Sequence, residues 1–122
     1  MDRIFTVEEA RALMPALLER AGEFVSMRGD LAELAQDLRE RGASRLGGLP
    51  EAKAFEARLE EILGWFGAHG VEVKGIAPLL LDFPSELDGV PVRLCWLEGD
   101  RDLGWYHRED LGFAGRRPLR RA

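Results

Sequence analysis

The spacing of the apolar residues changes once along this chain, near residue 70, and this change restricts the fold more than any other feature. Before it, Ala10, Leu17, Phe24, Leu31 and Leu38 recur every seven residues, which is the pattern of a helix with one apolar stripe. After it, apolar and polar residues alternate, as they do along half-buried strands. Helices followed by strands, rather than alternating with them, predict an α+β protein.

The helical part, over about residues 6–69, is predicted to be a long antiparallel hairpin. Thr6 and Glu9 have the spacing of a capping box, so the first helix should begin there and run to about Arg41. The glycines of segment 42–48 predict the turn between the two helices. The hairpin should present its apolar stripe to the strands that follow.

The second helix should run over about residues 50–69, with Gly70 as the stop. Its apolar face is predicted to comprise Phe55, Leu59, Ile62, Leu63 and Phe66. On the first helix, Pro15, Gly22 and Gly29 stand seven apart and therefore share one stripe. The proline should kink the first turns, and the glycines either let another helix approach closely or weaken the middle of the helix.

The second part is predicted to be a four-stranded antiparallel meander over about residues 71–108, followed by a glycine- and arginine-rich tail at 109–122. The whole chain is expected to form one domain. The Asp-Gly pair at 88–89 is a strong signal for a two-residue hairpin turn, and it fixes a register in which Asp82 lies opposite Cys95. The four strands are predicted at residues 71–74, 79–83, 92–97 and 103–108.

The next turn decides which residues share a face. An even-length turn near Asp100 would place Trp105 and His107 on the face that covers the helices, together with Trp96. The opposite face is predicted to carry Leu80, Asp82, Arg93, Cys95, Leu97, Tyr106 and Arg108. On this register Asp82 and His107 face away from each other, and they could meet only through a bulge or across a dimer interface.

The composition argues against several classes of protein. The chain of 122 residues has a net charge of −5, which disfavours a nucleic-acid binder because neutralising phosphates needs clustered Lys and Arg. One cysteine cannot form an internal disulfide, so a cytoplasmic location is expected. No membrane span or secretion is expected, since a long apolar run and a leader are lacking. Arg116, Arg117, Arg120 and Arg121 are expected to contact the acidic helices, with an RNA or DNA contact as the alternative.

Short motifs along the chain together resemble one bacterial protein family. They are Phe-Thr-x-x-Glu-Ala at 5–10, Leu-Leu-Asp-Phe-Pro at 80–84, Leu-Cys-Trp-Leu-Glu-Gly-Asp at 94–100, Trp-Tyr-His at 105–107 and Gly-Phe-Ala-Gly-Arg-x-Pro-Leu at 112–119. Their combination is similar to the domain of unknown function 2203 family over essentially the whole chain. The resemblance implies a shared fold and a cytoplasmic bacterial setting, with no activity attached.

Polar residues of these motifs are candidates for a site. A metal or acid–base site is predicted from His107 with Asp82 or Asp100, since carboxylates are hard anionic ligands and imidazole titrates near neutrality. The alternative is that Asp82 pairs with Arg93 or with an arginine of the tail, and that His107 is a satisfied residue at the edge of the core. The predicted ligand-binding residues are Asp82, Arg93, Trp96, Asp100, Tyr106, His107 and Arg116.

Two further positions have alternative interpretations. Segment 112–116 could bind an anion through its backbone amides and Arg116, or form a turn that places Phe113 in the core. Cys95 is expected to behave as a small apolar group, because no catalytic partner is predicted beside it.

Two functions follow, and the sequence leaves open whether the protein is an enzyme. The first is a non-enzymatic interaction module that forms a homodimer through its helix or sheet faces and recognises another protein. The second is a small metal-binding protein or metal-dependent hydrolase with a divalent metal ion as its cofactor.

Overall fold

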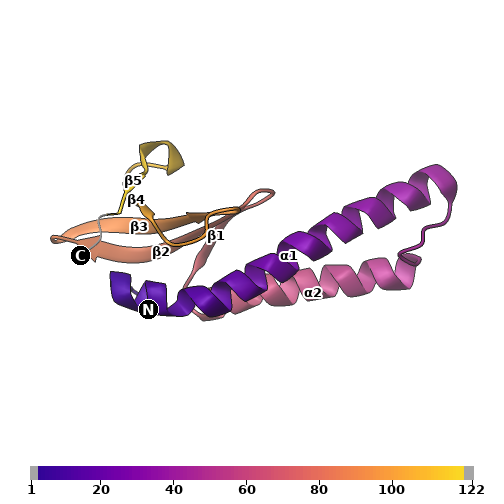
Figure 1. The fold of residues 1–122 in the computed structure, drawn as a ribbon, viewed down its shortest axis with the longest axis horizontal. Coiled ribbons are helices and arrows are strands. Elements are labelled where there is room, and N and C mark those ends of the chain that lie inside the picture. The colour runs from indigo at the N-terminus through magenta and orange to yellow at the C-terminus, as the bar shows by residue number, and fades with distance from the viewer. Residues whose placement is uncertain (1–2, 120–122) are drawn as a thin grey trace.

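The computed structural model describes residues 3–119, which form two helices followed by a five-stranded antiparallel sheet (Figure 1). The α+β class is therefore confirmed, with one strand more than the four predicted. The helices are α1 (Val7–Arg41) and α2 (Leu49–Ala68). The strands lie in chain order across the sheet and are β1 (Glu72–Ile76), β2 (Leu79–Leu87), β3 (Val90–Leu97), β4 (Trp105–Arg108) and β5 (Arg117–Pro118).

The additional strand, β5, lies in the segment predicted as a tail. It follows a short 3-10 helix, Phe113–Gly115, and pairs with Trp105 and Tyr106 of β4. Two residues, one of them a proline, are too few for an alternating pattern, so no strand was predicted there. Arg120 and Arg121, for which a contact with the acidic helices was predicted, lie outside the described residues.

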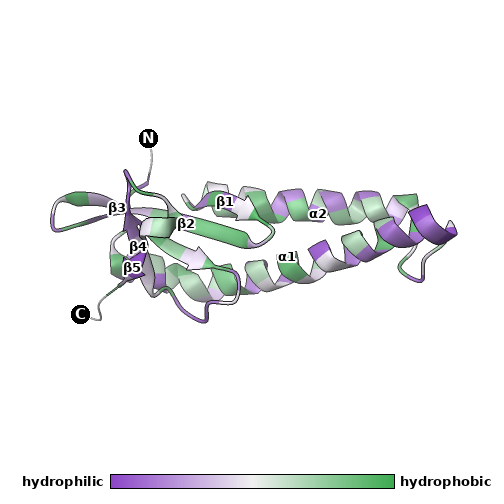
Figure 2. Ribbon diagram, turned by 90° about the horizontal axis from the view of Figure 1, so that it is seen from above, coloured by the Kyte–Doolittle hydropathy of each residue, from purple (hydrophilic) through white to green (hydrophobic). Residues whose placement is uncertain are grey.

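The two helices lie side by side as a hairpin that extends well beyond the sheet (Figures 1 and 2). α1 begins with the predicted capping box: the Thr6 hydroxyl accepts from the Glu9 amide at 3.0 Å, and the Glu9 carboxylate accepts from the Thr6 amide at 2.8 Å. It ends, as predicted, at Arg41, after which Gly42 takes a φ of 72°, a left-handed value that favours glycine. The buried residues of α1 are Ala10, Met14, Leu17, Ala21, Phe24 and Leu34.

One face of the sheet, here called the inner face, packs on the near half of the hairpin and forms the core. From β2 and β3 this core takes Leu79, Leu81, Phe83, Val92, Leu94 and Trp96, all buried, and from the helices Leu17, Phe24, Ile62 and Phe66. Phe5 extends the sheet ahead of α1: its amide donates to the Pro84 carbonyl at 2.7 Å, and its carbonyl accepts from the Ser85 hydroxyl at 2.6 Å. The near end of the hairpin is therefore fixed to the sheet by both packing and hydrogen bonds.

The predicted register of β2 and β3 is confirmed. Asp88 and Gly89 form the two-residue turn, both with positive φ, and Asp82 lies opposite Cys95. The residues that share a face alternate along each strand, so this turn fixes the inner and outer positions of both strands.

The predicted register of β3 and β4 is wrong by one residue. Arg93 lies opposite His107, Leu94 opposite Tyr106 and Cys95 opposite Trp105. Trp105 and His107 are therefore on the face turned away from the helices, the outer face, while Tyr106 and Arg108 are on the inner face. The reason is the connection: residues 98–104 form an odd-numbered loop instead of an even-length turn near Asp100.

The stripe of α1 that carries Pro15, Gly22 and Gly29 is not covered by another part of residues 3–119. Pro15 lies inside the continuous helix, and a Cβ added at Gly22 or Gly29 would meet nothing within 4 Å. The predicted close approach of another helix at these glycines is therefore not made within residues 3–119. In this part of the chain, neither helix combines the length and the apolar character needed to cross a bilayer.

Candidate functional site

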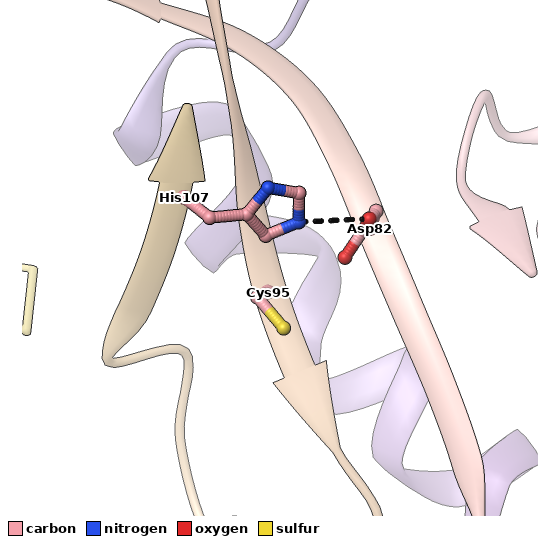
Figure 3. Close-up of side chains that lie close together, drawn as sticks. All are labelled: Asp82, Cys95 and His107. Carbon is pink, nitrogen blue, oxygen red and sulfur yellow. Dashed lines mark hydrogen bonds and ion pairs between the residues drawn. The ribbon is translucent and has the colours of Figure 1, made fainter. Parts of the chain in front are cut away.

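Three adjacent strands bring a carboxylate, a thiol and an imidazole together on the outer face of the sheet (Figure 3). Asp82 comes from β2, Cys95 from β3 and His107 from β4. Residues that lie opposite each other in an antiparallel pair project from the same face. Asp82 lies opposite Cys95, and His107 lies opposite Arg93, two residues before Cys95 on the same strand. The register of two hairpins thus assembles the cluster.

The cluster is withdrawn from solvent. Asp82 is 3% exposed, Cys95 0% and His107 6%. One potential ligand atom from each residue lies within 4.8 Å of the other two. Because burying a polar or charged group costs free energy unless it is paired, the hydrogen bonds of these three side chains decide what the cluster can do.

The ring of His107 is held in one orientation by the backbone. Its Nδ1 lies 2.9 Å from the carbonyl oxygen of Arg108, and since a carbonyl can only accept, Nδ1 carries a proton. In the neutral ring Nε2 is then a free acceptor, directed at Oδ2 of Asp82 at 3.2 Å. A ring with one N–H fixed by a carbonyl and the other nitrogen free is the usual arrangement of a histidine metal ligand.

Asp82 is incompletely satisfied. Burial raises the pKa of its carboxyl, and the neighbouring His107 opposes the rise. The short contact between Nε2 and Oδ2 needs a cation between two acceptors, which is either a proton or a metal ion. The other oxygen, Oδ1, is buried and has no hydrogen-bond partner among residues 3–119. An orphaned acceptor of this kind is rare in a folded protein and requires a partner.

The thiol of Cys95 is the third group. Burial, and then the charge of Asp82, raise the pKa of Cys95 to about 11, while the guanidinium of Arg116 opposes this shift. Without a metal ion, Cys95 is therefore a neutral thiol at physiological pH. With one, it would offer a soft ligand between the oxygen of Asp82 and the nitrogen of His107.

Arg116 places a positive charge next to the Cys95 thiol of the cluster. Its guanidinium carbon lies 4.3 Å from the ring centroid of Trp105 and 4.8 Å from that of Phe113. Its Nη1 lies 3.8 Å from Oδ2 of Asp100, and it is buried without a hydrogen-bond partner in residues 3–119. Segment 112–116 thus places a fixed positive charge near the Cys95 sulfur and leaves Phe113 42% exposed instead of in the core.

A hollow of about 300 Å³ opens over Asp82 and His107. Its walls are Lys74, Leu80, Arg93, Glu109, Leu111, Gly112 and Phe113. Two of the three clustered side chains therefore face a space that a small molecule can enter. The volume lies at the lower end of the range for ligand sites.

The donor set fits zinc or a similar divalent transition metal. Zinc binds thiolate, imidazole and carboxylate ligands, and catalytic zinc sites use three protein ligands and leave one position open. Asp82, Cys95 and His107 supply one ligand of each kind, and the orphaned Oδ1 gives an acceptor that a metal ion would satisfy. All three are available without a change of fold.

The other predicted site residues have different roles. Arg93 pairs with Glu72 at 2.8 Å and with Glu109 at 3.0 Å, so the predicted alternative that it neutralises Asp82 is wrong. Asp100 is not brought to His107: its carboxylate accepts from the Leu97 amide at 3.0 Å and closes the β3–β4 loop.

Two aromatic candidates also lie away from the cluster. Trp96 is 3% exposed in the core, and its indole N–H donates to the Asp100 carbonyl at 3.0 Å. Tyr106 is on the inner face, opposite Leu94, and packs against the core. The predicted grouping of Tyr106 with Asp82 on one face is therefore wrong.

The family model described as "Uncharacterized conserved protein (DUF2203)" matches residues 3–119. The chain belongs to the DUF2203 family. No curated protein and no solved structure matches it. The family carries no assigned activity, so the chemistry of this DUF2203 chain has to be argued from its own residues.

The proximity of Cys95 to His107 was not predicted from the sequence, although Cys95 is buried and neutral as expected. The correct β2–β3 register already placed Cys95 opposite Asp82, but the even-length turn moved His107 to the wrong face. The distance of ten residues between Cys95 and its partner Trp105 is the feature that sets the face of His107. Residues 98–104 are mostly polar residues and glycines, and this composition does not predict whether the loop between β3 and β4 has an odd or an even number of residues.

Proposed function

We propose that this DUF2203 protein binds a divalent transition metal ion, best matched by zinc, through Asp82, Cys95 and His107. The proposal depends above all on the buried Asp82 carboxylate, whose Oδ1 has no partner among residues 3–119 and whose Oδ2 meets Nε2 of His107. A proton shared by the pair accounts for the second contact and leaves the first oxygen unsatisfied. A metal ion bound by the carboxylate would satisfy the orphaned oxygen as well.

The surroundings support a site that is open on one side. The hollow over Asp82 and His107 gives room for a water molecule or a small ligand beside the bound ion. Such an ion would supply Lewis-acid chemistry and lower the pKa of a bound water molecule. The residues of this chain would fix the ligands: the Arg108 carbonyl orients His107, and the Arg116 guanidinium favours the thiolate of Cys95. Metal-dependent hydrolysis is the activity to test once binding is established.

Metal affinity is expected to rise with pH. Binding must displace the proton of Cys95, whose pKa burial raises to about 11. Each proton released per ion adds one power of ten in affinity for each pH unit, as long as that group is protonated in the free protein. A metal site on exposed carboxylates alone would show almost no such dependence near neutrality.

The test is metal content by mass spectrometry on untagged protein purified without chelators, followed by zinc titration of the metal-free chain. One ion per chain is expected, and His107→Ala and Cys95→Ser should both lose it while keeping their circular dichroism spectra. His69→Gln is the matched control, because His69 also has an Nδ1 bonded to a backbone carbonyl, that of Trp65, but lies away from the cluster. Metal-free protein that takes up no zinc, or equal uptake by His107→Ala, would contradict the proposal.

The homodimeric, non-enzymatic interaction module stays a prediction alongside the metal site, as do a protein partner and a bacterial, cytoplasmic setting. Exposed apolar side chains support a contact surface: Leu111 and Phe113, which are 44% and 42% exposed, lie at the entrance of the metal-site hollow. Analytical ultracentrifugation of the wild-type protein and of Phe113→Ser, with and without zinc, would test whether self-association uses this entrance. A monomer at all concentrations would reject the dimer.

A further inference from the structure

A second and larger hollow lies on the inner face of the sheet. The β2–β3 turn projects past the first turn of α1, so the hairpin covers only part of this face (Figures 1 and 2). The uncovered part forms a groove of about 730 Å³, bounded by the start of α1 on one side and by segment 115–119 on the other. This volume lies within the range of small-molecule sites.

The groove is lined mainly by aliphatic side chains. These are Val7, Leu87, Val90, Val92, Leu111 and Leu119. Val90 is 45% exposed and Leu111 44%, so apolar area remains accessible although the rest of the inner face is packed against the hairpin. An apolar hollow of this kind gains free energy when a ligand removes it from water.

Cationic groups are set among these aliphatic side chains. Arg11, Arg108 and Arg117 line the groove, with Asp88 as the one acidic residue of its lining. Arg108 is neutralised by Asp110, to which its guanidinium donates twice. Arg11 donates only to the Leu103 carbonyl, at 3.4 Å, and Arg117 has no carboxylate partner among residues 3–119. Two guanidinium groups are thus available to an anion.

We propose that this groove binds a small amphipathic carboxylate, such as a medium-chain fatty acid. The alkyl chain would cover the aliphatic lining, and the carboxylate would pair with Arg117 or Arg11, whose planar donors match its geometry. A bare phosphate would leave the apolar lining in water, and a neutral alcohol would leave the arginines without an anion. The groove is on the opposite face of the sheet from Asp82 and His107, and Leu111 is the one residue that lines both hollows. The arginines of the groove are therefore distinct from the proposed metal ligands.

The test is a titration of the isotope-labelled full chain with decanoate below its micelle concentration, followed by amide chemical shifts. Decan-1-ol and decyltrimethylammonium are the controls of equal chain length. Decanoate is expected to shift the amides of Val90 and Leu119 and to bind at least about tenfold more tightly than either control, the factor that one charge-assisted hydrogen bond provides. Equal binding of the alcohol, or shifts elsewhere in the chain, would overturn the proposal.

Three variants test the site: two locate the anion and one blocks the groove. Arg117→Gln should weaken decanoate binding about tenfold, whereas Arg101→Gln, an exposed arginine outside the groove, should leave it unchanged. Val90→Asp places a carboxylate in the groove at an exposed position and should remove decanoate binding while zinc uptake is retained. Loss of affinity in Arg101→Gln equal to that in Arg117→Gln would show unspecific charge attraction and reject the site.

Discussion

The two faces of the sheet hold their carboxylates in opposite ways. At the junction with the helices, Glu98 accepts from Arg28 through both oxygens at 2.8 Å and also accepts from the Leu79 amide at 2.9 Å. These hydrogen bonds, above all that of Arg28, lower the pKa of Glu98 to about 2. On the outer face, Asp82 is more deeply buried and has only His107 and the weak thiol donor of Cys95 as partners among residues 3–119, and burial raises its pKa.

The two carboxylates therefore differ in how completely the fold pairs them. Glu98 is saturated by partners and serves the fold, since it ties α1 to the start of β2. Asp82 is buried with one carboxylate oxygen that accepts no hydrogen bond among residues 3–119. A structural ion pair is expected to have all its hydrogen bonds within the chain, whereas a ligand-binding carboxylate is expected to keep an oxygen available for its ligand.

The largest effect is expected on the inner face. Leu94→Ala removes a side chain with 0% exposure from the core and should lower the free energy of unfolding by about 2–5 kcal/mol, since a cavity is left behind. Chemical denaturation monitored by circular dichroism measures the loss. Val90→Ala, on the same strand but 45% exposed, is the control and should change stability by less than about 1 kcal/mol. Comparable losses in both variants would show that Val90 is packed as tightly as the core and does not line an accessible groove.

On the outer face, Asp82→Asn should stabilise the metal-free protein while removing metal binding. The amide can donate to Nε2 of His107 without a shared proton or a buried charge, so we expect a gain of about 1–3 kcal/mol at pH 8. Because the folded pKa of Asp82 is raised, its contribution to stability is present below the unfolded value of 3.8 and is lost as pH rises through the folded pKa. The gain should therefore vanish at pH 3. Asp102→Asn, an exposed aspartate, is the control, and a destabilised Asp82→Asn protein would contradict the comparison.

Glu98→Gln should have the opposite sign. The folded pKa of Glu98 is depressed, so its stabilisation is present above the unfolded value of 4.5 and is lost as pH falls toward 2. Both side chains of the pair are about a quarter exposed, so the expected loss at pH 7 is about 1 kcal/mol. Thermal melts at pH 7 and pH 2.5 measure it, with the exposed Glu86→Gln as the control. A loss that persists unchanged at pH 2.5 would show that Glu98 connects α1 to the sheet through packing and not through its charge.

The smallest effect on stability is expected at Cys95. Without metal, its thiol is a neutral group in a packed site, and Cys95→Ala should cost about 1 kcal/mol or less. The same variant should bind zinc far more weakly than wild type, because a ligand is lost. Zinc-dependent increases in melting temperature compare the two proteins. An identical zinc-induced increase in Cys95→Ala would remove the thiol from the site and leave at most a two-ligand cluster.

Much of the fold followed from local patterns. The capping box at Thr6, the end of α1 at Arg41 and the turn at Asp88-Gly89 each depend on neighbouring residues with a strong conformational preference, and each was predicted. β5 could not be predicted, because Arg117 and Pro118 are too few to form a pattern. The faces of Trp105, Tyr106 and His107 were predicted wrongly, because a single residue in the length of the β3–β4 loop reverses all of them.

The candidate site shows the same division. Asp82, His107 and the facing position of Cys95 could be found in the sequence, but the three could not be joined there. Their meeting depends on the register of β3 and β4, in which Cys95 lies opposite Trp105 and His107 opposite Arg93. This register is defined only once the two strands are paired.

Most elements of this protein and their order can be predicted from its sequence, because helix caps, hydrophobic periods and an Asp-Gly turn act over a few neighbouring residues. Which polar side chains are buried together, and which oxygen of Asp82 lacks a partner, becomes defined only in the folded protein. Burial and pairing depend on the register of three hairpin-connected strands. Register is a property of the assembled sheet and not of any one segment.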